Sequence, residues 1–440
     1  MDQAGSAAGS AAAAATGSPV TFSVSVSAAL SAAFPSDSAV GFSAGFPAGF
    51  GAGFAGAAGV GVESAAFSAA DSPVCSSADS AAAGSAAGPS AGVPTAAWGA
   101  AKALTSSAVR VPEDQAERIA AQHYGIAASA RRLPGEKDDN FELVAGADAW
   151  LLKVVHPEEP ADVTNLGTSA LLALEGIADV PVQRVIQTTM GDAEVVVRAA
   201  DGSTRRARMT SFLEGRLLRS VPSSAPLREN LGRVLARLGQ ELSDFTHPAG
   251  SRPLLWDLWQ ADQVRLLLDD LDPLDGRELL VECLDHFEAE IRPRLARLRR
   301  QMIHNDLSGD NVLVAEDGVT VAGILDFGDA VVTQLINDLA VAATNLLAPD
   351  DDPLAPALDF VRGYHRVVAL TEPELALLYD LVRLRITIRI VVTEWRSLRF
   401  PENREYILRN TPGAWSLLRT MPASGARDAS RRLMAACGPR

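Results

Sequence analysis

The sequence predicts an α+β protein with two lobes, a small β-rich N-terminal lobe and a larger helical C-terminal lobe, behind a disordered N-terminal tail. Three observations support this prediction. Residues 1–100 contain 66 Ala, Ser and Gly residues, short strand-like stretches follow as far as residue 213, and apolar residues then recur at helical spacing. We expect the tail over residues 1–108, the N-terminal lobe over 109–213, the C-terminal lobe over 214–425 and a flexible C-terminus over 426–440.

The first 108 residues lack the composition of a folded core. No Lys or Arg precedes Lys102, and Gly-Phe pairs recur in an Ala- and Ser-rich background. Such a segment cannot bury enough apolar surface to offset the entropy that is lost on ordering it. We therefore expect disorder here, with an adhesive or phase-separating tail as the functional alternative.

The elements of the N-terminal lobe follow in chain order. Residues 111–114, Val-Pro-Glu-Asp, open an amphipathic run to Ala121, and acids in the first turn after a proline predict a helix. A polar turn within Leu133–Leu143 then separates two strands, and residues 149–155 predict a further strand in which Lys153 is the odd charged residue. More strands are expected at 194–198 and 208–213.

The C-terminal lobe is predicted to be helical with one β insertion. Apolar residues at three- and four-residue spacing predict helices at 227–245, 258–268, 279–300, 355–368 and 372–399. Between the third and fourth of these, Ile303–Asp329 is typical of a hairpin of two apolar strands with polar residues at both ends. The insertion is therefore expected to carry polar side chains to one end of a small sheet.

Charge and cysteine content exclude several classes of partner. The chain carries 39 basic and 54 acidic residues, a formal net charge of -15, which disfavours nucleic acid and anionic membranes as partners. Cys75, Cys283 and Cys437 are too few and too scattered for a disulfide framework or a zinc site. No strongly apolar stretch is long enough to span a bilayer and no cationic leader opens the chain, so we expect a cytoplasmic protein.

The residues best suited to catalysis and metal binding are concentrated in the β insertion. His304-Asn305-Asp306 is followed by Asn311, five residues after that Asp, and by Asp326-Phe327-Gly328, 20 residues after it. Phosphoryl transfer needs a carboxylate for the acceptor hydroxyl and oxygen ligands for a Mg²⁺ ion that bridges the phosphates. Asp306 suits the first task, while Asn311 and Asp326 suit the second. With Lys153 as a phosphate contact, these residues form a protein-kinase-like signature.

This signature resembles that of the aminoglycoside phosphotransferase and choline kinase superfamily, which shares the two-lobed protein-kinase fold but phosphorylates small metabolites. The hydroxylysine kinase branch is the more similar one, through Leu133–Phe141, Gly323–Asp329, Asn337–Ala340, Asn403–Leu408 and Gly413–Leu418. The resemblance covers about residues 110–420.

The resemblance implies a role for each candidate site residue. Asp306 would be the catalytic base, Asn311 and Asp326 the magnesium ligands, and Lys153 would hold the α- and β-phosphates of ATP or GTP. A turn from Gly135 to Asn140 would cover the phosphates, and Met209–Leu213 would form the interlobe hinge, where backbone groups meet the purine. The nucleotide-binding residues besides Lys153 are thus expected to be Gly135, Asp139, Asn140, Met209, Ser211 and Phe212.

Three further residues are expected to support this site. Asp306 already has the role of the base, so we interpret His304 as a structural prop of the catalytic loop. Asp338 either caps or tethers that loop or serves a helix start. Asp329 offers an acid near the cleft.

The helix after Lys153 departs from the protein-kinase pattern, in which a helix Glu pairs with the strand Lys. The expected helix at about residues 163–174 carries Gly167-Thr168-Ser169 where that acid would stand. Four acids remain open as partners for Lys153, namely Glu158, Glu159, Asp162 and Glu175.

The acceptor is expected to be a small cationic or zwitterionic alcohol. Asp329 and Glu394 offer acids near the cleft. Arg383, Arg385 and Arg389 either meet a substrate carboxylate or bridge acids between helices, and the last two share one helix face.

The resemblance favours 5-hydroxylysine as the acceptor, with GTP used as readily as ATP. Homoserine, choline-like amino alcohols and aminoglycosides are the alternatives. A non-catalytic nucleotide-binding module is the alternative of a different class. A protein kinase is disfavoured because no Ala-Pro-Glu element follows Asp326-Phe327-Gly328.

Overall fold

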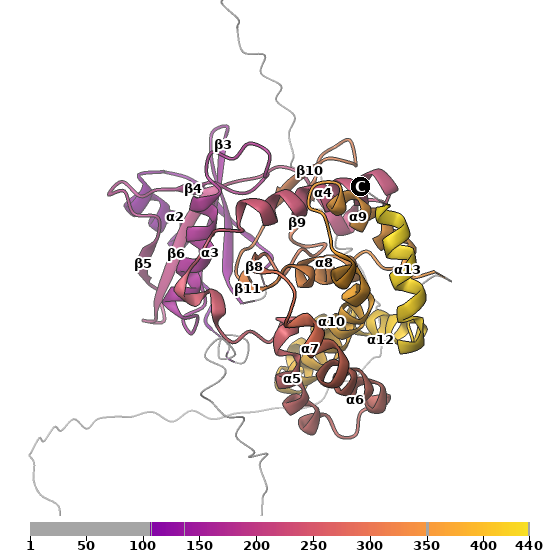
Figure 1. The fold of residues 1–440 in the computed structure, drawn as a ribbon. Helices are drawn as coiled ribbons and strands as arrows, with labels where there is room; N and C mark the ends of the chain where they lie inside the picture. Colours follow the sequence, from indigo (N-terminus) through magenta and orange to yellow (C-terminus); the bar gives the residue numbers. More distant parts are fainter. Residues whose placement is uncertain (1–105, 107, 136, 349–351, 439–440) are drawn as a thin grey trace, which may run out of the picture. The chain divides into compact units, whose positions relative to one another are not determined.

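The computed structural model describes residues 106, 108–135, 137–348 and 352–438 of the chain (Figure 1). The expected tail over residues 1–108 lies outside the described residues, except for Ser106 and Ala108. The elements below therefore belong to the two expected lobes and to the C-terminal segment.

An antiparallel sheet forms the N-terminal lobe. Its strands pair in the order β1-β2-β3-β6-β4, with β5 also paired to β6. Helix α2 (Glu113–Ile119), continued by a π-helical turn (Ala120–Tyr124), packs on β1 and β2, and α3 (Ala161–Ala173) packs on β4 and β6. The strands are β1 (Ser129–Leu133), β2 (Asp139–Ala145), β3 (Asp148–Val154), β4 (Val185–Ile186), β5 (Val195–Arg198) and β6 (Thr204–Ser211).

The pairing register gives the sheet two chemically different faces. Phe141, Leu152 and Met209 lie opposite one another on neighbouring strands, and all three are fully buried in the core under α2. Asn140 lies opposite Lys153 on β3, and Lys153 lies opposite Arg208 on β6. Because successive side chains alternate between the faces of a sheet, this second face is polar and points away from the apolar core.

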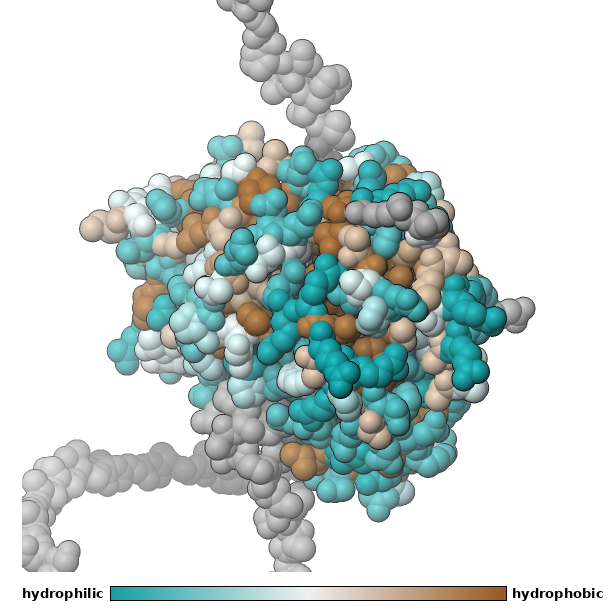
Figure 2. Space-filling view, in the orientation of Figure 1, coloured by the Kyte–Doolittle hydropathy of each residue, from teal (hydrophilic) through white to brown (hydrophobic). Residues whose placement is uncertain are grey.

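Helix α10 (Glu372–Arg399) organises the C-terminal lobe. It contacts α6 (Arg277–His286), α8 (Leu335–Thr344), α11 (Arg404–Leu408), α12 (Thr411–Thr420) and α13 (Ala426–Cys437). The helix begins and ends at the predicted residues, 372 and 399. Thr371 and Glu374 form a capping box that fixes its start. Figure 2 shows hydrophilic residues over most of the outer surface where α5 (Ala261–Val264), α6 and α7 (Arg292–Leu295) lie.

Helices α4 (Ala225–Glu241) and α9 (Ala355–His365) pack closely through two glycines. A Cβ atom on Gly232 would lie 2.0 Å from the carbonyl oxygen of Phe360, and one on Gly363 would lie 2.1 Å from that of Glu229. Neither backbone can retreat without separating the helices. Both positions therefore require glycine for a close approach.

Two short antiparallel sheets position the segments between them. One has the strand order β10-β9-β7, and the other pairs β11 with β8. The two apolar strands of the predicted hairpin are β9 and β10, whereas the other sheet was not predicted. The strands are β7 (Arg216–Leu217), β8 (Arg300–Ile303), β9 (Val312–Val314), β10 (Val321–Ile324) and β11 (Val331–Gln334).

The structure corrects three predicted segments. Residues 258–271 form short pieces, 3-10 turns on either side of α5 (Ala261–Val264), in place of one helix. The helix expected at 279–300 widens into a π turn at Phe287–Ile291 and continues only as α7 (Arg292–Leu295), where Pro293 lacks the N–H that a regular helix needs. The C-terminus expected to be flexible is helix α13 over Ala426–Cys437, and its Ala429 and Leu433 are buried.

Among the described residues, no helix is long and apolar enough to cross a membrane.

Candidate active site

The loop between β8 and β9 is fixed by Asp338 on α8. Its carboxylate accepts hydrogen bonds from the backbone N–H groups of His304 at 3.3 Å and Asn305 at 2.8 Å. Asn305 has a φ of 64°, in the left-handed region that Asn tolerates better than most residues. Asp338 is buried, and this burial raises its pKa to about 6. Of the two roles left open for Asp338, this geometry is that of a tether, because Asp338 lies in the first turn of α8 but its carboxylate accepts from the loop, and Gln334 occupies the N-cap of the helix.

His304 connects this loop to the segment Asp326-Phe327-Gly328. Its Nδ1 accepts the N–H of Asp306 at 3.2 Å, and its Nε2 lies 3.0 Å from the carbonyl oxygen of Leu325. The ring also meets the edge of Phe327, with 4.9 Å between ring centroids. Burial lowers the pKa of His304 to about 4, so the ring is neutral at pH 7 and Nε2 donates to the carbonyl. Both nitrogens are occupied, which supports the interpretation of His304 as a prop.

Asp306 and Asn311 lie side by side at the end of the loop. The amide Nδ2 of Asn311 donates to the backbone oxygen of Asp306 at 3.0 Å and to its Oδ2 at 2.5 Å. Burial and the neighbouring charge of Asp329 raise the pKa of Asp306 well above its ordinary value, and Arg385 opposes them. A carboxylate with a raised pKa is a stronger base than an ordinary one, provided that it is still ionised.

Asp326 lies at the start of the facing segment, within reach of Lys153. The Nζ atom of Lys153 lies 3.1 Å from each carboxylate oxygen of Asp326. Burial raises the pKa of Asp326, but the charges of Lys153 and Arg208 outweigh it and hold this pKa well below the usual range. The Asp326 side chain is 45% exposed. It is therefore an ionised carboxylate that is open to a ligand.

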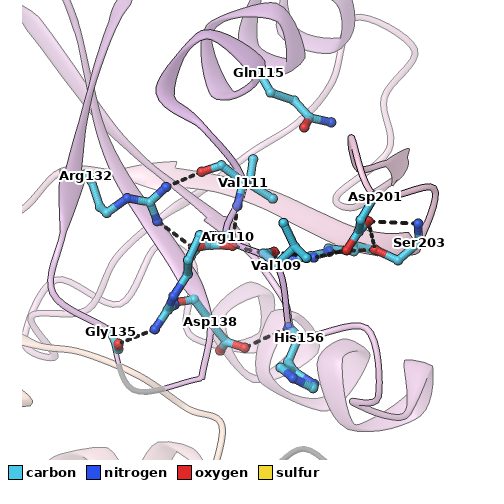
Figure 3. Close-up of polar contacts among 12 residues, drawn as sticks. Val109, Arg110, Val111, Gln115, Arg132, Gly135, Asp138, His156, Asp201 and Ser203 are labelled. Carbon is cyan, nitrogen blue, oxygen red and sulfur yellow. Dashed lines mark hydrogen bonds and ion pairs between the residues drawn. The ribbon is translucent and has the colours of Figure 1, made fainter. Parts of the chain in front are cut away.

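Asp138 is the second acid at Lys153, and none of the four open candidates takes this place. Its Oδ2 lies 3.1 Å from Lys153 Nζ. Its Oδ1 accepts the N–H of His156 at 3.0 Å, as Figure 3 shows. Burial lowers the pKa of Lys153, but the two carboxylates outweigh it and raise this pKa overall. Glu159 instead pairs with Lys137 at 2.7 Å.

Arg208 occupies the space where a helix acid was expected. Its Nη1 donates to the backbone oxygen of Thr164 at 3.4 Å and to the hydroxyl of Thr168 at 3.3 Å. A Cβ atom on Gly167 would lie 3.3 Å from this Nη1. The glycine on α3 therefore leaves room for an arginine from β6, and the acid that holds Lys153 comes from the turn before β2.

Asp139 was predicted to bind nucleotide, and the structure contradicts this. The side chain is 2% exposed and lies on the opposite face of β2 from Lys153. Its oxygens contact the guanidinium groups of Arg110 at 3.3 Å, Arg132 at 2.5 Å and Arg205 at 3.3 Å. They also accept the N–H of Val111 at 3.0 Å. Asp139 therefore holds Arg110 and Val111, which precede α2, and its carboxylate is closed to a ligand.

The turn before β2 keeps its expected place near Lys153. A Cβ atom on Gly135 would lie 2.5 Å from the backbone oxygen of Asp138 and 2.7 Å from Nδ2 of Asn140, so this tight turn requires glycine. Arg110 donates to the backbone oxygens of Gly135 and Asp138 (Figure 3). Asn140 lies opposite Lys153 on the polar face of the sheet. Gly135 and Asn140 thus remain candidates for nucleotide contacts.

The predicted hinge is present, but two of its three residues do not offer the expected contacts. Met209 lies within β6, where its backbone pairs with Leu152 of β3 and Ile186 of β4, and its side chain is fully buried in the core. Ser211 donates its N–H to the carbonyl of Arg184 at 2.8 Å, and its hydroxyl accepts the N–H of Arg184 at 2.9 Å. The N–H of Phe212 lies 3.4 Å from the carbonyl of Ala149. Among the described residues, none hydrogen-bonds the carbonyl of Phe212 or the N–H of Leu213, which leaves these groups for a purine.

Arg252 holds the segment after Asp326 and was missed by the sequence analysis. Its guanidinium donates to the backbone oxygens of Gly328 and Ala330, each at 2.6 Å. Asp329 lies between these residues, and burial raises its pKa while Lys137 and Arg252 oppose the rise. No local motif marks Arg252, because its contacts lie more than 70 residues away along the chain.

The oxygen atoms of Asn311 and Asp326 fit a hard divalent cation. Because Nδ2 of Asn311 faces Asp306, its Oδ1 points the other way and can act as a ligand. The described residues contain no cluster of three or more His, Cys, Asp or Glu that would hold a metal by themselves. This suits Mg²⁺, which commonly takes one or two protein ligands and completes its shell with phosphate oxygens and water.

Comparison with known proteins relates this arrangement to a family. The model of the phosphotransferase enzyme family matches residues 129–378, more than half of the chain. A hydroxylysine kinase from Xenopus laevis is 24% identical over 348 residues, which cover 73% of this chain and 93% of the relative. A homoserine kinase from Methylobacillus flagellatus is 30% identical over 202 residues, which cover 45% of this chain and 60% of the relative.

A solved structure shares the fold at low sequence identity. An amicoumacin kinase in complex with AMP-PNP, Ca²⁺ and Ami superposes with a TM-score of 0.51 at 17% identity. The match covers 68% of this chain and 94% of the other. The two-lobed kinase-like fold predicted from the sequence is thereby confirmed.

Proposed function

The chain belongs to the phosphotransferase enzyme family, and we propose that it transfers the γ-phosphate of ATP or GTP to the hydroxyl group of 5-hydroxylysine. Phosphotransfer to a small molecule is the activity of the family relatives described above. The identity of the acceptor and of the nucleotide is our inference. A cytoplasmic location stays a prediction from the sequence.

The observation that carries this proposal is the grouping of Asp306, Asn311 and Asp326 with Lys153. Three segments far apart in the sequence bring these side chains together, and hydrogen bonds or ion pairs link them in two pairs. The carboxylate of Asp306 has a raised pKa, whereas the carboxylate of Asp326 has a lowered pKa. Two neighbouring carboxylates with opposite pKa shifts suit two tasks, proton acceptance and cation binding.

Each residue has a defined part in the proposed reaction. Asp306 accepts the hydrogen bond of the acceptor hydroxyl and orients its oxygen toward the γ-phosphorus. It takes the proton as the new P–O bond forms, while the bond from the γ-phosphorus to the bridging oxygen breaks and the nucleoside diphosphate leaves with that oxygen. Lys153 neutralises the α- and β-phosphates, and Asp138 keeps its ammonium group in place. Most of the rate comes from positioning and charge neutralisation, because the transferred group needs little covalent help.

Asn311 and Asp326 would hold Mg²⁺ at this site. When bound, the ion would supply positive charge that offsets the negative charge of the phosphates. Lys153 contacts both oxygens of Asp326, and we propose that its ammonium shifts toward the phosphates when nucleotide binds.

The choice of 5-hydroxylysine rests on the relatives. The hydroxylysine kinase match extends over almost the whole relative, whereas the homoserine kinase match covers a shorter part. Homoserine is therefore the second candidate acceptor. Choline-like amino alcohols and aminoglycosides remain weaker alternatives, and a non-catalytic nucleotide-binding module is the alternative of a different class.

A coupled assay of nucleoside diphosphate release tests the proposal. The full chain is given Mg²⁺ with ATP or GTP and one acceptor, chosen from 5-hydroxylysine, homoserine, choline, ethanolamine and an aminoglycoside. We expect turnover that depends on 5-hydroxylysine and exceeds the rate without acceptor. Faster turnover of another alcohol would identify that alcohol as the acceptor in place of 5-hydroxylysine. Nucleotide binding without turnover of any alcohol would favour the non-catalytic module.

A further inference from the structure

Two arginines of α10 lie on the side of the site that holds the proposed base. Arg385 is 5% exposed and Arg389 is half-buried, and they lie one helical turn apart on the same face. Arg389 is linked to the loop of Asp306 through Asn345, whose Oδ1 accepts from Arg389 at 2.8 Å and whose Nδ2 lies 3.5 Å from the backbone oxygen of Leu307, the residue after Asp306. The positive charges of both arginines also act on Asp306 and lower its pKa.

Among the residues that the structure describes, neither arginine forms an ion pair with an acid. The charges of Asp306, Asp329 and Asp257 act on Arg385 from a longer distance, and that of Asp306 acts on Arg389. Arg385 donates to the backbone oxygen of Trp256 at 2.8 Å and stacks over its ring at 4.9 Å, and its buried Nε has no partner. Arg389 donates to Oδ1 of Asn345 at 2.8 Å. A guanidinium group has five N–H donors, so most of the donors of this pair remain for another acceptor.

Other arginines of the same helix do have acidic partners. Arg383 lies 3.9 Å from Glu282, and Arg399 lies 3.3 Å from Asp270. Of the three arginines named in the sequence analysis, Arg383 thus follows the alternative of a bridge to an acid on another helix. Arg385 and Arg389 depart from that pattern at the point where α10 passes Asp306. Burial lowers the pKa of Arg389 to about 10, so it keeps its charge at neutral pH.

The neighbours of the pair hold it in a fixed orientation. Asn345, which accepts from Arg389, donates its own Nδ2 to the backbone oxygen of Val341 at 3.0 Å and to that of Leu307 at 3.5 Å. Leu307 follows Asp306 directly in the chain. The Trp256 ring similarly fixes Arg385. Two preorganised guanidinium groups beside a base form a site for an anionic group on the molecule that the base serves.

We propose that Arg385 and Arg389 bind the carboxylate of an amino-acid acceptor and so select hydroxy amino acids over amino alcohols that lack this group. The inference rests on the proposed function, because it assumes that the acceptor hydroxyl meets Asp306. It also deepens that function, since carboxylate binding would place the far end of the acceptor and fix the distance from there to its hydroxyl.

Two pairs of acceptors that differ only in the carboxylate test the proposal. The first pair is 5-hydroxylysine and 1,5-diaminopentan-2-ol, and the second is homoserine and 3-aminopropan-1-ol. We expect the better amino acid to have a kcat/KM at least roughly 10- to 100-fold above that of its decarboxylated partner, the range for hydrogen bonds to a charged group. Equal or better use of the decarboxylated partner would overturn the carboxylate site and leave the proposed phosphotransfer intact.

Variants of the pair separate binding from a structural role. Arg389→Gln and Arg385→Gln should lower kcat/KM for the amino acid roughly 10- to 100-fold, mainly through KM, and should reduce the preference over its decarboxylated partner to near unity. Arg389→Lys should recover part of the preference because it restores a charge. Arg399→Gln, on the same helix and paired with Asp270, is the matched control and should keep the preference. An equal loss for both acceptors of a pair would indicate a structural role and contradict the proposal.

Thermal unfolding separates failure of this inference from failure of the proposed function. With Mg²⁺ and a non-hydrolysable ATP analogue, millimolar 5-hydroxylysine or homoserine should raise the Tm of the wild type but not that of Arg389→Gln. No turnover of any acceptor would overturn the proposed function, whereas a selective rise in Tm would still support the carboxylate site. No shift and no preference would overturn the site itself.

Discussion

At the scale of single residues, the site depends on how its neighbours set the pKa of Asp306. Asp329 adds negative charge and raises this pKa, whereas Arg385 and Arg389 add positive charge and lower it. The base works only when it is ionised. The rate should therefore fall as the pH is lowered through a pKa that lies above the ordinary value of an aspartate.

Two substitutions should shift, in opposite directions, the pH at which kcat falls on acidification. Asp329→Asn removes a negative neighbour, lowers the pKa of Asp306 and shifts the fall in kcat to lower pH. Arg385→Gln removes a positive neighbour and shifts the fall to higher pH. Profiles of kcat at saturating substrates, measured between about pH 5 and 8, check both directions. Shifts of the same sign, or no shift in either variant, would contradict the role of Asp306 as base.

At the scale of elements, the alternation of side chains at the start of β2 places two adjacent acids on opposite faces of the sheet. Asp138 faces Lys153 at the site, whereas Asp139 faces the arginines behind the sheet. The two residues are both aspartates and are adjacent in the chain. They therefore form a matched pair for distinguishing function from stability.

Asparagine substitutions at these two positions should have different effects. Asp138→Asn loosens Lys153 and is expected to raise the KM for the nucleotide roughly tenfold, the effect of losing one charged contact. Asp139→Asn leaves three guanidinium groups without their common carboxylate and is expected to lower the free energy of unfolding by at least ~2 kcal/mol. Steady-state kinetics and denaturant unfolding measure the two effects. A loss of stability in Asp138→Asn together with a raised nucleotide KM in Asp139→Asn would contradict the placement of the two side chains on opposite faces.

Local signals in the sequence predicted elements and motifs better than they predicted contacts. The capping box at Thr371 and the long apolar periodicity after it were sufficient for α10. The helix pattern of protein kinases predicts an acid on or near α3 as the partner of Lys153, and this prediction is wrong because Asp138, in the turn before β2, takes that place. The register of the β2–β3 hairpin, with Asn140 opposite Lys153, was the available signal for Asp138.

Contacts between distant segments explain the remaining errors. Strand β8 forms only by pairing with β11, and α13 is held by its packing on α9 and α10. Neither partner is visible in the local pattern of residues 300–303 or 426–437. Arg208 and Arg252 likewise act through backbone oxygens and hydroxyls of remote segments, which no local motif marks.

At the scale of the whole molecule, the two ends of the chain should differ in their importance. Deleting residues 426–440 removes buried Leu433 and exposes parts of α9 and α10, which should lower the free energy of unfolding by at least ~2 kcal/mol. Deleting residues 1–105 should leave kcat and KM within about twofold, because the family match and the site lie beyond them. Thermal unfolding and the coupled assay check both deletions. A stable protein after the first deletion, or an inactive one after the second, would contradict these expectations.

Asp306→Asn tests the central claim most directly, because it removes the base and keeps the size of the side chain. The measurement is nucleoside diphosphate release with Mg²⁺, nucleotide and 5-hydroxylysine, together with the Kd for the nucleotide. A member of this family that uses Asp306 as its base should lose at least ~10²-fold in kcat while the nucleotide Kd changes little. Turnover close to that of the wild type would contradict the assignment of Asp306 and with it the proposed mechanism.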